Sequence, residues 1–314
     1  MTPEIKKILP GLKTNIELKK HTTFKIGGPA KYFFIAKTKE GLIKAIKTAK
    51  EFNLPFFILG GGSNLLVSDK GYKGLVIKTG KPLFSYISKG LEWAVGIPGT
   101  IEGAVYGNAG VFEKSMKDAV ESVEVLDAET GKIKVFKNRD CQFTYRDSIF
   151  KRNKNLIILS VKIKPKKSNP KKIKEYLNYK KETQPLNFPS AGCAFKNPKL
   201  TSKNQKLLRK FPEFKKLIRE GMIPAAFLIE KCGLKGKKTG RAEFSKKHAN
   251  FIVNLGGVHP HTKRTPRLAQ KNKICVRCGV GARAKDVLKL MKLAKQKVKN
   301  KFGIDLQEEI QVVK

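Results

Sequence analysis

The stretch ILGGGSNLL, residues 58–66, places three consecutive glycines between an apolar run and a Ser-Asn pair. Glycine loses more backbone freedom on folding than any other residue, so a run of three needs a reason. A loop without Cβ atoms lets backbone N–H groups converge closely on an anion. Two interpretations are therefore open for Gly60, Gly61 and Gly62: a phosphate or pyrophosphate cradle, or a tight connection after a strand.

The spacing of these glycines excludes two common nucleotide-binding loops. The pattern G-x-x-x-x-G-K-[ST] of a P-loop is absent, and Leu65 stands where the dinucleotide fingerprint G-x-G-x-x-G needs its third glycine. A second stretch, VGIPGTIEGAVYGNAG at 95–110, holds glycines at 96, 99, 103, 107 and 110. Two such loops favour a long ligand that the backbone approaches at several points.

Apolar periodicity around the first loop predicts an α/β lobe. The spacing of Leu42, Ile46 and Ala49 predicts a helix over 39–52, and apolar runs predict strands at 31–36, 54–59 and 74–78. Further along, the patterns predict a β-hairpin at 120–136 with its turn at 128–131, a strand at 155–163, a connection at 164–172, a helix at 172–182, a helix at 225–234, a strand at 248–255, a helix at 286–302 and a last strand at 306–313.

Charge is the most conspicuous bulk property of the 314-residue chain. It has 67 Lys and Arg against 25 Asp and Glu, a formal charge of +42. Two interpretations are open: a polyanionic partner, or a lysine-rich surface without such a partner. The second is favoured, because lysine is spread along the whole chain. Five cysteines are an odd number and too few for a disulfide scaffold. The N-terminus lacks a signal-peptide core and no apolar run is long enough to span a membrane, so we expect a cytoplasmic protein.

Seven motifs that occur in a fixed order along the chain give it a resemblance to a known family. They are HTTFKIGGPA (21–30), ILGGGSNLLVSD (58–69), GIPGT (96–100), YRDSIFK (145–151), ETQPLNFPSAGCAFKNP (182–198), LIEKCGLKG (228–236) and KHANFIVN (247–254). Together they resemble the UDP-N-acetylenolpyruvoylglucosamine reductase family, from about residue 15 to 314. Any one motif is weakly specific, whereas seven in this order are strongly so.

The resemblance implies an α/β (α+β) fold with two domains. The first would be a two-lobed FAD-binding domain of the vanillyl-alcohol-oxidase (PCMH) type, and the second a C-terminal α/β substrate-binding domain. We expect these at 1–180, with lobes at about 1–79 and 80–180, and at 181–314, with a basic insertion at 258–281. The second lobe is expected to be shortened, because KPLFSYIS alone stands where the family usually has a strand, a turn and a helix.

The resemblance also implies bound FAD, with NADPH as co-substrate. The cofactor-binding residues carried over by the motifs are Thr23, Gly60, Gly61, Gly62, Ser63, Asn64, Gly99, Thr100 and Gly103. The first glycine loop would hold the FAD pyrophosphate, and the second would line the flavin. Glu102 stands where the family generally has a glycine, and we expect a carboxylate there to weaken phosphate binding.

The implied reaction is the NADPH-dependent reduction of enolpyruvyl-UDP-N-acetylglucosamine to UDP-N-acetylmuramate through FAD, in peptidoglycan precursor synthesis. The reduced flavin supplies hydride, and the protein must stabilise an enolate and deliver a proton. Arg146 matches the arginine that faces the substrate carboxylate, and Cys193 takes the place of the usual serine proton donor. Glu309 matches the C-terminal catalytic glutamate that assists Arg146. Asn197 matches a substrate-binding position of the family. Lys196 beside it and Tyr145 are further substrate-binding candidates, with a solvated surface position as the alternative for Lys196 and core packing as the alternative for Tyr145.

Taken without the resemblance, each catalytic candidate has a second interpretation. Arg146 would be a surface cation paired with Asp147, and Cys193 a small buried apolar residue. A thiol with a reference pKa of about 8.5 is mostly protonated at pH 7, so donation by Cys193 is chemically reasonable. Alternation over 306–313 places Leu306, Glu308 and Ile310 on one face and Glu309 on the opposite face, as a solvent-facing strand residue.

The insertion raises a further alternative. Residues 246–285 contain ten Lys or Arg and no Asp or Glu. We expect a solvated basic loop without metal, and the alternative is a zinc site formed by His259, His261, Cys275 and Cys278. The alternative function is a degenerate flavoprotein fold that acts as a basic nucleic-acid-binding or scaffold protein. Under the leading interpretation, the partner is the small-molecule substrate, without membrane or nucleic acid, and the protein is a monomer.

Overall fold

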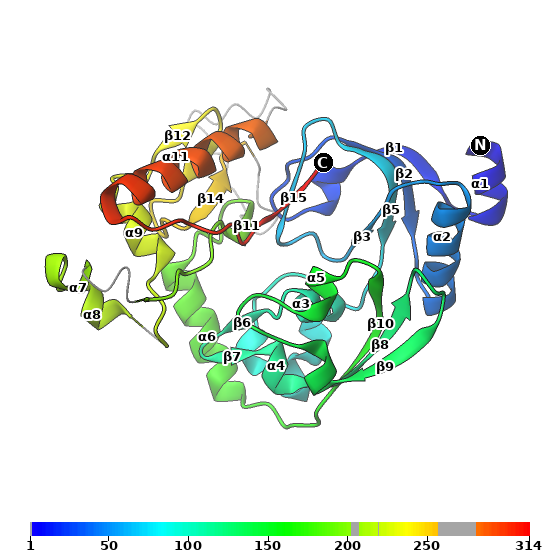
Figure 1. Ribbon diagram of the computed structural model, residues 1–314, viewed down its shortest axis with the longest axis horizontal. Helices are drawn as coiled ribbons and strands as arrows, with labels where there is room; N and C mark the ends of the chain where they lie inside the picture. The colour runs from blue at the N-terminus through cyan, green and yellow to red at the C-terminus, as the bar shows by residue number, and fades with distance from the viewer. Residues whose placement is uncertain (1, 202–206, 219, 257–280) are drawn as a thin grey trace, which may run out of the picture. The chain divides into compact units, whose positions relative to one another are not determined.

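The computed structural model describes residues 2–201, 207–218, 220–256 and 281–314 (Figure 1). The chain forms two compact units. Unit 1 consists of residues 1–17, 29–62 and 71–182, and unit 2 of residues 18–28, 63–70 and 183–314. Over the described ranges, no helix is both long and apolar enough to cross a membrane.

The first part of unit 1 is a four-stranded sheet with the strand order β1-β2-β5-β3. Its strands are β1 (Lys13–Glu17), β2 (Pro29–Ile35), β5 (Tyr72–Lys78) and β3 (Phe56–Leu59). The last three run parallel, which requires crossover connections. Helix α2 (Lys39–Glu51) connects β2 to β3 and begins at Thr38, whose hydroxyl accepts a hydrogen bond from Gly41 N (3.1 Å). The α/β lobe predicted from periodicity is confirmed.

The second part of unit 1 is a three-stranded antiparallel sheet with the order β10-β8-β9. Strands β8 (Val120–Asp127) and β9 (Ile133–Lys137) form the predicted hairpin, and β10 (Leu156–Ile163) pairs with β8. A hydrophobic core joins this sheet to helix α3 (Ile101–Tyr106) and buries Trp93 and Phe150. The segment KPLFSYISK, where the sequence predicts a shortened lobe, contains 3-10 helix η2 (Leu83–Lys89), and the shortening stays a prediction.

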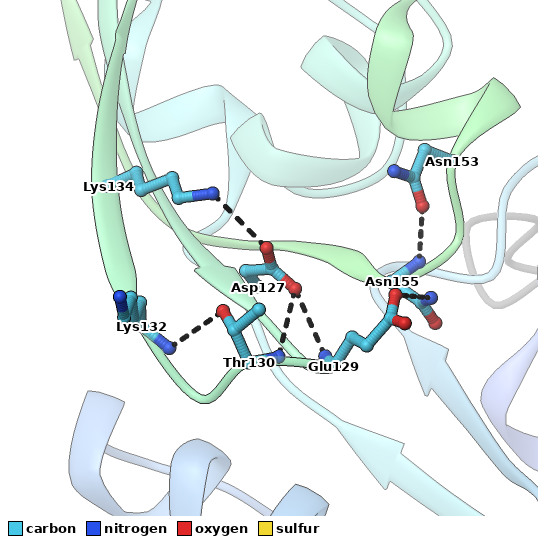
Figure 2. A network of polar contacts seen from close by, with 7 residues as sticks. All are labelled: Asp127, Glu129, Thr130, Lys132, Lys134, Asn153 and Asn155. Carbon is cyan, nitrogen blue, oxygen red and sulfur yellow. Dashed lines mark hydrogen bonds and ion pairs between the residues drawn. The ribbon is translucent and has the colours of Figure 1, made fainter.

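Polar contacts define the turn of the β8–β9 hairpin, as Figure 2 shows. The Asp127 carboxylate accepts hydrogen bonds from Glu129 N (3.1 Å) and Thr130 N (3.3 Å) and pairs with Lys134 Nζ (3.2 Å). The bond from Thr130 N is the main cause that lowers the pKa of Asp127. An aspartate that accepts hydrogen bonds from the residues after it is typical of tight turns, and these bonds lie at the turn predicted for 128–131.

Unit 2 contains an antiparallel sheet with the order β11-β14-β13-β12. Its strands are β11 (Ser190–Cys193), β14 (Phe251–Asn254), β13 (Ala242–Phe244) and β12 (Lys238–Thr239). Helices α9 (Ala225–Lys231) and α11 (Ala284–Phe302) pack in the same core (Figure 1). Helix α11 is capped by Asp69, which accepts hydrogen bonds from Ala284 N (2.7 Å) and Lys285 N (3.1 Å).

The predicted last strand is shorter than expected. Only β15 (Gln311–Val313) is a strand, parallel to β4 (Leu65–Val67), and Glu308 forms an isolated bridge to Phe195. The strict alternation over 306–313 was therefore wrong. Leu306 and Ile310 are buried as expected, but Glu308, expected on their face, is exposed and pairs with Lys295 (2.6 Å).

The remaining elements are short, apart from the helix at the end of unit 1. They are α1 (Thr2–Ile8), η1 (Leu18–His21), η3 (Glu92–Ala94), β6 (Gly110–Val111), β7 (Lys114–Ser115), α4 (Met116–Ala119), η4 (Asn138–Cys141), α5 (Ile149–Arg152), α6 (Pro170–Thr183), α7 (Leu207–Lys210) and α8 (Phe214–Leu217). The predicted connection at 164–172 ends earlier than expected, because α6 starts at Pro170.

Candidate active site

The two glycine-rich loops of unit 1 pack against each other. A Cβ atom on Gly61 would overlap the Cα atom of Gly99, and one on Gly60 would lie 2.7 Å from the Oγ1 atom of Thr100. Such distances are shorter than any side chain tolerates, so the two backbones can approach only because both positions are glycine. The contact joins the end of β3 to the GIPGT motif and supports a shared binding function for the two loops.

Thr100 and Glu102 shape the start of helix α3. The Thr100 hydroxyl accepts a hydrogen bond from Gly103 N (3.2 Å) and caps the helix. The Glu102 carboxylate accepts a hydrogen bond from Lys81 N (2.9 Å), and burial raises the pKa of this carboxyl. Glu102 therefore holds the connection between β5 and η2 against the start of α3. Its expected effect on phosphate binding stays a prediction.

Arg146 lies in a tight turn. Thr144 and Asp147 exchange two backbone hydrogen bonds of 3.1 Å across Tyr145 and Arg146, and Arg146 adopts the left-handed conformation (φ 56°). The guanidinium donates a hydrogen bond to Gly110 O (2.6 Å) and lies over the Tyr145 ring, 5.3 Å from its centroid. Tyr145 itself is 43% exposed, so its side chain is accessible to a ligand. The acidic neighbour, Asp147, forms an ion pair with Arg152.

Asn108 is a residue of this region that sequence reasoning missed. It is buried, and its side chain donates to Thr144 O (2.8 Å) and accepts from Lys117 N (3.0 Å). Two further bonds run from the YRDS motif to the same glycine-rich stretch: Ser148 Oγ to Tyr106 O (2.7 Å), and the bond from Arg146 to Gly110 described above. The stretch 95–110 therefore also holds the turn that carries Arg146.

Lys180 is a buried lysine of unit 1. It is the one buried side chain of helix α6, 3% exposed, and its Nζ donates a hydrogen bond to Val95 O (2.5 Å). A Cβ atom on Gly96 would lie 3.5 Å from its Cδ. Burial lowers the pKa of Lys180 to about 8. The start of the second glycine-rich loop is thus held by a side chain that no motif indicated.

Replacing Lys180 by methionine is expected to remove a pH dependence of stability. With a pKa of about 8 against 10.5 in a model compound, the folded protein binds fewer protons than the unfolded chain between these values. The wild type therefore gains stability as the pH rises from 8 to 10.5, on the order of 1–2 kcal/mol by pH 9.5, or roughly 2–6 °C in Tm. Thermal unfolding at pH 7 and pH 9.5 checks this.

The matched control for this prediction is Lys174→Met, because Lys174 is an exposed residue of the same helix. We expect the Tm difference between wild type and Lys180→Met to change with pH, while that between wild type and Lys174→Met stays constant. Parallel Tm curves for all three proteins would contradict the assignment.

In unit 2, Cys193 ends strand β11 next to a bulge. The pairing of β11 with β14 shifts register between Ser190 and Cys193, and Gly192 has a φ of +76° that favours glycine. Bulges re-aim the side chains that follow them. The Cys193 side chain is partly exposed, whereas the alternative interpretation expected a small buried apolar residue.

Asn250 fixes the strand that carries Cys193 and was also missed. It is 2% exposed, and its amide exchanges two hydrogen bonds with Phe195, from Phe195 N (3.0 Å) and to Phe195 O (2.8 Å). Its own carbonyl accepts from Ala194 N (2.7 Å). A buried amide with both ends satisfied imposes a single backbone position. The motif KHANFIVN contained this residue, but its sequence gave no signal that Asn250 was the contact.

Glu309 is joined to two predicted site segments of unit 2. Its N–H donates to Ala194 O (2.9 Å), directly after Cys193, and its carbonyl accepts from Asn64 Nδ2 (3.0 Å). Thr23 contributes a third link, because its hydroxyl donates to Ser190 O (2.8 Å) at the start of the Cys193 strand. Unit 2 thus brings together Thr23, Asn64, Cys193 and Glu309.

The two remaining substrate-binding candidates lie just beyond Cys193. Lys196 N donates to Gln307 O (2.9 Å), which continues the pairing with the C-terminal segment. The Asn197 side chain accepts a hydrogen bond from Ala225 N (3.0 Å) and so helps to fix the start of α9. Both side chains are partly exposed.

The zinc alternative lies outside the described residues. His259, His261, Cys275 and Cys278 fall within 257–280, for which no placement is described. Over the described ranges, no three His, Cys, Asp or Glu side chains are grouped so as to hold a metal ion.

Two family models match the sequence. The model described as "UDP-N-acetylenolpyruvoylglucosamine reductase, C-terminal domain" matches residues 184–276 and 267–313. The model described as "FAD binding domain" matches residues 30–89, a range that includes the first glycine-rich loop. These matches cover the first glycine-rich loop and the region of Cys193.

Curated relatives share nearly the whole chain. UDP-N-acetylenolpyruvoylglucosamine reductase of Caldanaerobacter subterraneus subsp. tengcongensis is 36% identical over 96% of this chain and 93% of its own length. The reductase of the same name from Anoxybacillus flavithermus is 34% identical over 96% of this chain and 94% of its own. The crystal structure of the UDP-N-acetylenolpyruvylglucosamine reductase from Thermus caldophilus matches with a TM-score of 0.69 and 30% identity, covering 96% of this chain and 99% of that one.

Proposed function

Since the chain belongs to the UDP-N-acetylenolpyruvoylglucosamine reductase family, we propose that Arg146, Cys193 and Glu309 carry out the reaction of that family. The protein is an FAD-containing oxidoreductase that uses NADPH to reduce enolpyruvyl-UDP-N-acetylglucosamine in peptidoglycan synthesis. The observation that supports the assignment of Cys193 and Glu309 is the hydrogen bond from Glu309 N to Ala194 O (2.9 Å), which holds the C-terminal segment beside the residue that follows Cys193.

The residues present fit FAD. Gly60 and Gly61 pack so closely on Gly99 and Thr100 that a side chain at either position would overlap the opposite loop. Loops of this kind expose backbone N–H groups, which suit the two phosphates of a dinucleotide. Gly60 to Asn64 would hold the pyrophosphate, and Gly99, Thr100 and Gly103 would line the flavin. When bound, FAD supplies the transfer of an electron pair from NADPH to the enolpyruvyl double bond.

Arg146 stabilises the negative charge that develops beside the substrate carboxylate. Its guanidinium carries a permanent charge and several N–H donors in a fixed fork, which suits a carboxylate or an enolate. The bond to Gly110 O and the contact with the Tyr145 ring restrict its position before substrate binds. A charge held in place in advance stabilises the transition state without reorganisation.

Cys193 donates the proton that completes the reduction, and Glu309 assists Arg146. The bulge at Gly192 and the clamp by Asn250 fix the backbone on both sides of the thiol, at Ser190 and Phe195. A proton donor must lie within hydrogen-bond reach of the carbon it protonates, so the fixed backbone favours a defined position of Sγ. The Sγ proton passes to the substrate, and the thiolate regains a proton from solvent.

The remaining expectations complete the proposal. Tyr145, Lys196 and Asn197 contact the substrate, with Lys196 supplying a positive charge for its anionic groups. The enzyme acts as a monomer in the cytoplasm, where NADPH and nucleotide-linked sugars are available. No finding favours the alternative of a nucleic-acid-binding or scaffold protein.

Replacing Arg146 by glutamine is expected to slow the oxidation of the reduced enzyme by enolpyruvyl-UDP-N-acetylglucosamine about 10²–10³-fold, as removal of a preorganised electrostatic donor does. Arg146→Lys should recover part of the rate, because it keeps the charge but loses the fork. Stopped-flow absorbance of the FAD-loaded protein under anaerobic conditions measures this step separately from reduction by NADPH.

The matched control for Arg146 is Arg152→Gln. Arg152 belongs to the same motif region and pairs with Asp147, but it has no role in the proposal. Its loss is expected to leave the rate within about twofold of wild type, as for most surface substitutions. An equal loss in both variants would assign the effect to local structure and would reject the role of Arg146.

A further inference from the structure

The Asn64 side chain contacts the C-terminal segment of unit 2. Its Nδ2 donates to the carbonyl of Glu309 (3.0 Å), and its own main-chain carbonyl accepts from Gln311 N (3.0 Å). From there, strand β4 runs parallel to β15 with Leu65 opposite Gln311, and Ser68 N donates to Val313 O (2.8 Å). Asn64 is therefore the first residue of a continuous attachment between the glycine loop and the end of the chain.

Glu309 lies where neither strand pairing holds it. The bridge to Phe195 ends at Glu308, and β15 begins at Gln311. The peptide groups on either side of Glu309 are held by two separate bonds, one from its N–H to Ala194 O and one from Asn64 Nδ2 to its carbonyl. Fixing both peptide groups fixes φ and ψ of the residue between them, and the rotamers open to a side chain depend on φ and ψ.

We propose that Asn64 is a positioning residue for Glu309: its side-chain amide, by holding the Glu309 carbonyl, sets the direction of the Glu309 carboxyl. The proposal deepens the proposed function and rests on the role given there to Glu309. The proposal gives the main chain and the side chain of Asn64 different tasks. The main chain of Asn64 belongs to the cofactor loop, and its side chain serves the acid in the second half of the reaction.

The side-chain amide of asparagine suits residue 64 to this role. An amide nitrogen donates without charge, so it holds a carbonyl without disturbing a nearby carboxylate. Aspartate has almost the same shape but, when ionised, only accepts hydrogen bonds. Asn64→Asp therefore removes the hydrogen bond to Glu309 O but keeps the volume of the side chain. Asn64→Ala removes the hydrogen bond and the side-chain volume.

A double-mutant cycle tests the proposal. We would measure the single-turnover oxidation of pre-reduced, FAD-loaded protein by enolpyruvyl-UDP-N-acetylglucosamine for wild type, N64A, E309Q and N64A/E309Q. Asn64→Ala is expected to slow this step about tenfold in the wild-type background, the size typical of coupled contacts, and to add less than about twofold to Glu309→Gln. An equal loss in both backgrounds would overturn the proposal.

Ser63→Ala is the matched control. Ser63 precedes Asn64 in the same loop and is assigned to cofactor binding only, so its effect should multiply with that of Glu309→Gln. If N64A is unstable, Asn64→Asp takes its place in the cycle, with the same expected result. An E309Q variant as fast as wild type would be a different failure, because it would reject the role of Glu309 and with it both proposals.

Hydrogen exchange gives a second measurement that does not depend on turnover. Loss of the bond from Asn64 Nδ2 is expected to speed amide exchange in the segment 307–311, at least about tenfold at Glu309 N–H, with no change in α11. Unchanged exchange in this segment for both Asn64 variants would contradict the proposal.

Discussion

Replacing Cys193 by alanine is expected to slow the oxidation of the reduced enzyme by its substrate about 10²–10⁴-fold, the contribution typical of a general acid. Cys193→Ser should retain much of the rate, because a hydroxyl also carries a transferable proton at the position where the family has serine. Stopped-flow absorbance under anaerobic conditions measures both. Reduction by NADPH, which needs no proton from Cys193, serves as the internal reference.

Cys232→Ala is the matched control for the thiol. Cys232 is a partly buried free cysteine of unit 2, and burial raises its pKa, so it is a poor proton source at neutral pH. Its replacement should leave the rate near that of wild type. Iodoacetamide, which alkylates accessible thiols, should inactivate wild type and Cys232→Ala but not Cys193→Ser. A Cys193→Ala variant that is oxidised at the wild-type rate would show that the proton comes from another group.

Gly61→Ala is expected to have the second large effect, on cofactor binding rather than on chemistry. The new methyl group would overlap the Cα atom of Gly99, and a backbone atom cannot rotate away as a side chain does. Overpacking costs about 1–3 kcal/mol, so the Kd for FAD should rise about tenfold to 100-fold as the two loops separate. Titration of the apoprotein with FAD, followed by quenching of flavin fluorescence, measures the Kd.

Gly107→Ala tests whether the effect is specific to the contact between the loops. Gly107 belongs to the second glycine-rich stretch, but the nearest atom to a Cβ there is Gly103 O at 3.8 Å, an ordinary contact. We expect Gly107→Ala to bind FAD as wild type does. If Gly61→Ala also binds FAD with the wild-type Kd, the packing of the loops has no part in the cofactor site.

The local elements of the fold were predictable from sequence, because each depends on a short pattern. The alternation of β8 and β9, with Asp127 at the turn, specifies a hairpin without reference to distant residues. The same holds for α2, which Thr38 caps and which presents an apolar face every three to four residues. Such patterns repeat within a few residues, so they survive in a single sequence.

The contacts that assemble the candidate site were not predictable, because they join residues remote in sequence. The bond from Asn64 to Glu309 spans 245 positions, and that from Phe195 to Asn250 spans 55. A polar side chain in a motif gives no local sign of which backbone it will hold. Asn108, Lys180 and Asn250 were missed for this reason.

The end of the chain shows how such contacts override a local pattern. The run LQEEIQVV has the alternation of a strand, but the segment is divided between two partners, Phe195 through Glu308 and β4 through Gln311. Glu309 lies at the change of partner and bonds to both sides. The sequence pattern carried no information on this division, although it places Leu306 and Ile310 correctly in the core.

The visible absorption spectrum of the purified protein tests the central claim most directly. It should be recorded anaerobically, first alone, then with NADPH, and then with enolpyruvyl-UDP-N-acetylglucosamine. We predict a yellow protein whose flavin absorbance NADPH bleaches and the substrate restores in the absence of oxygen. A colourless protein that cannot be reconstituted with FAD, or a flavin that the substrate leaves reduced, would contradict the account.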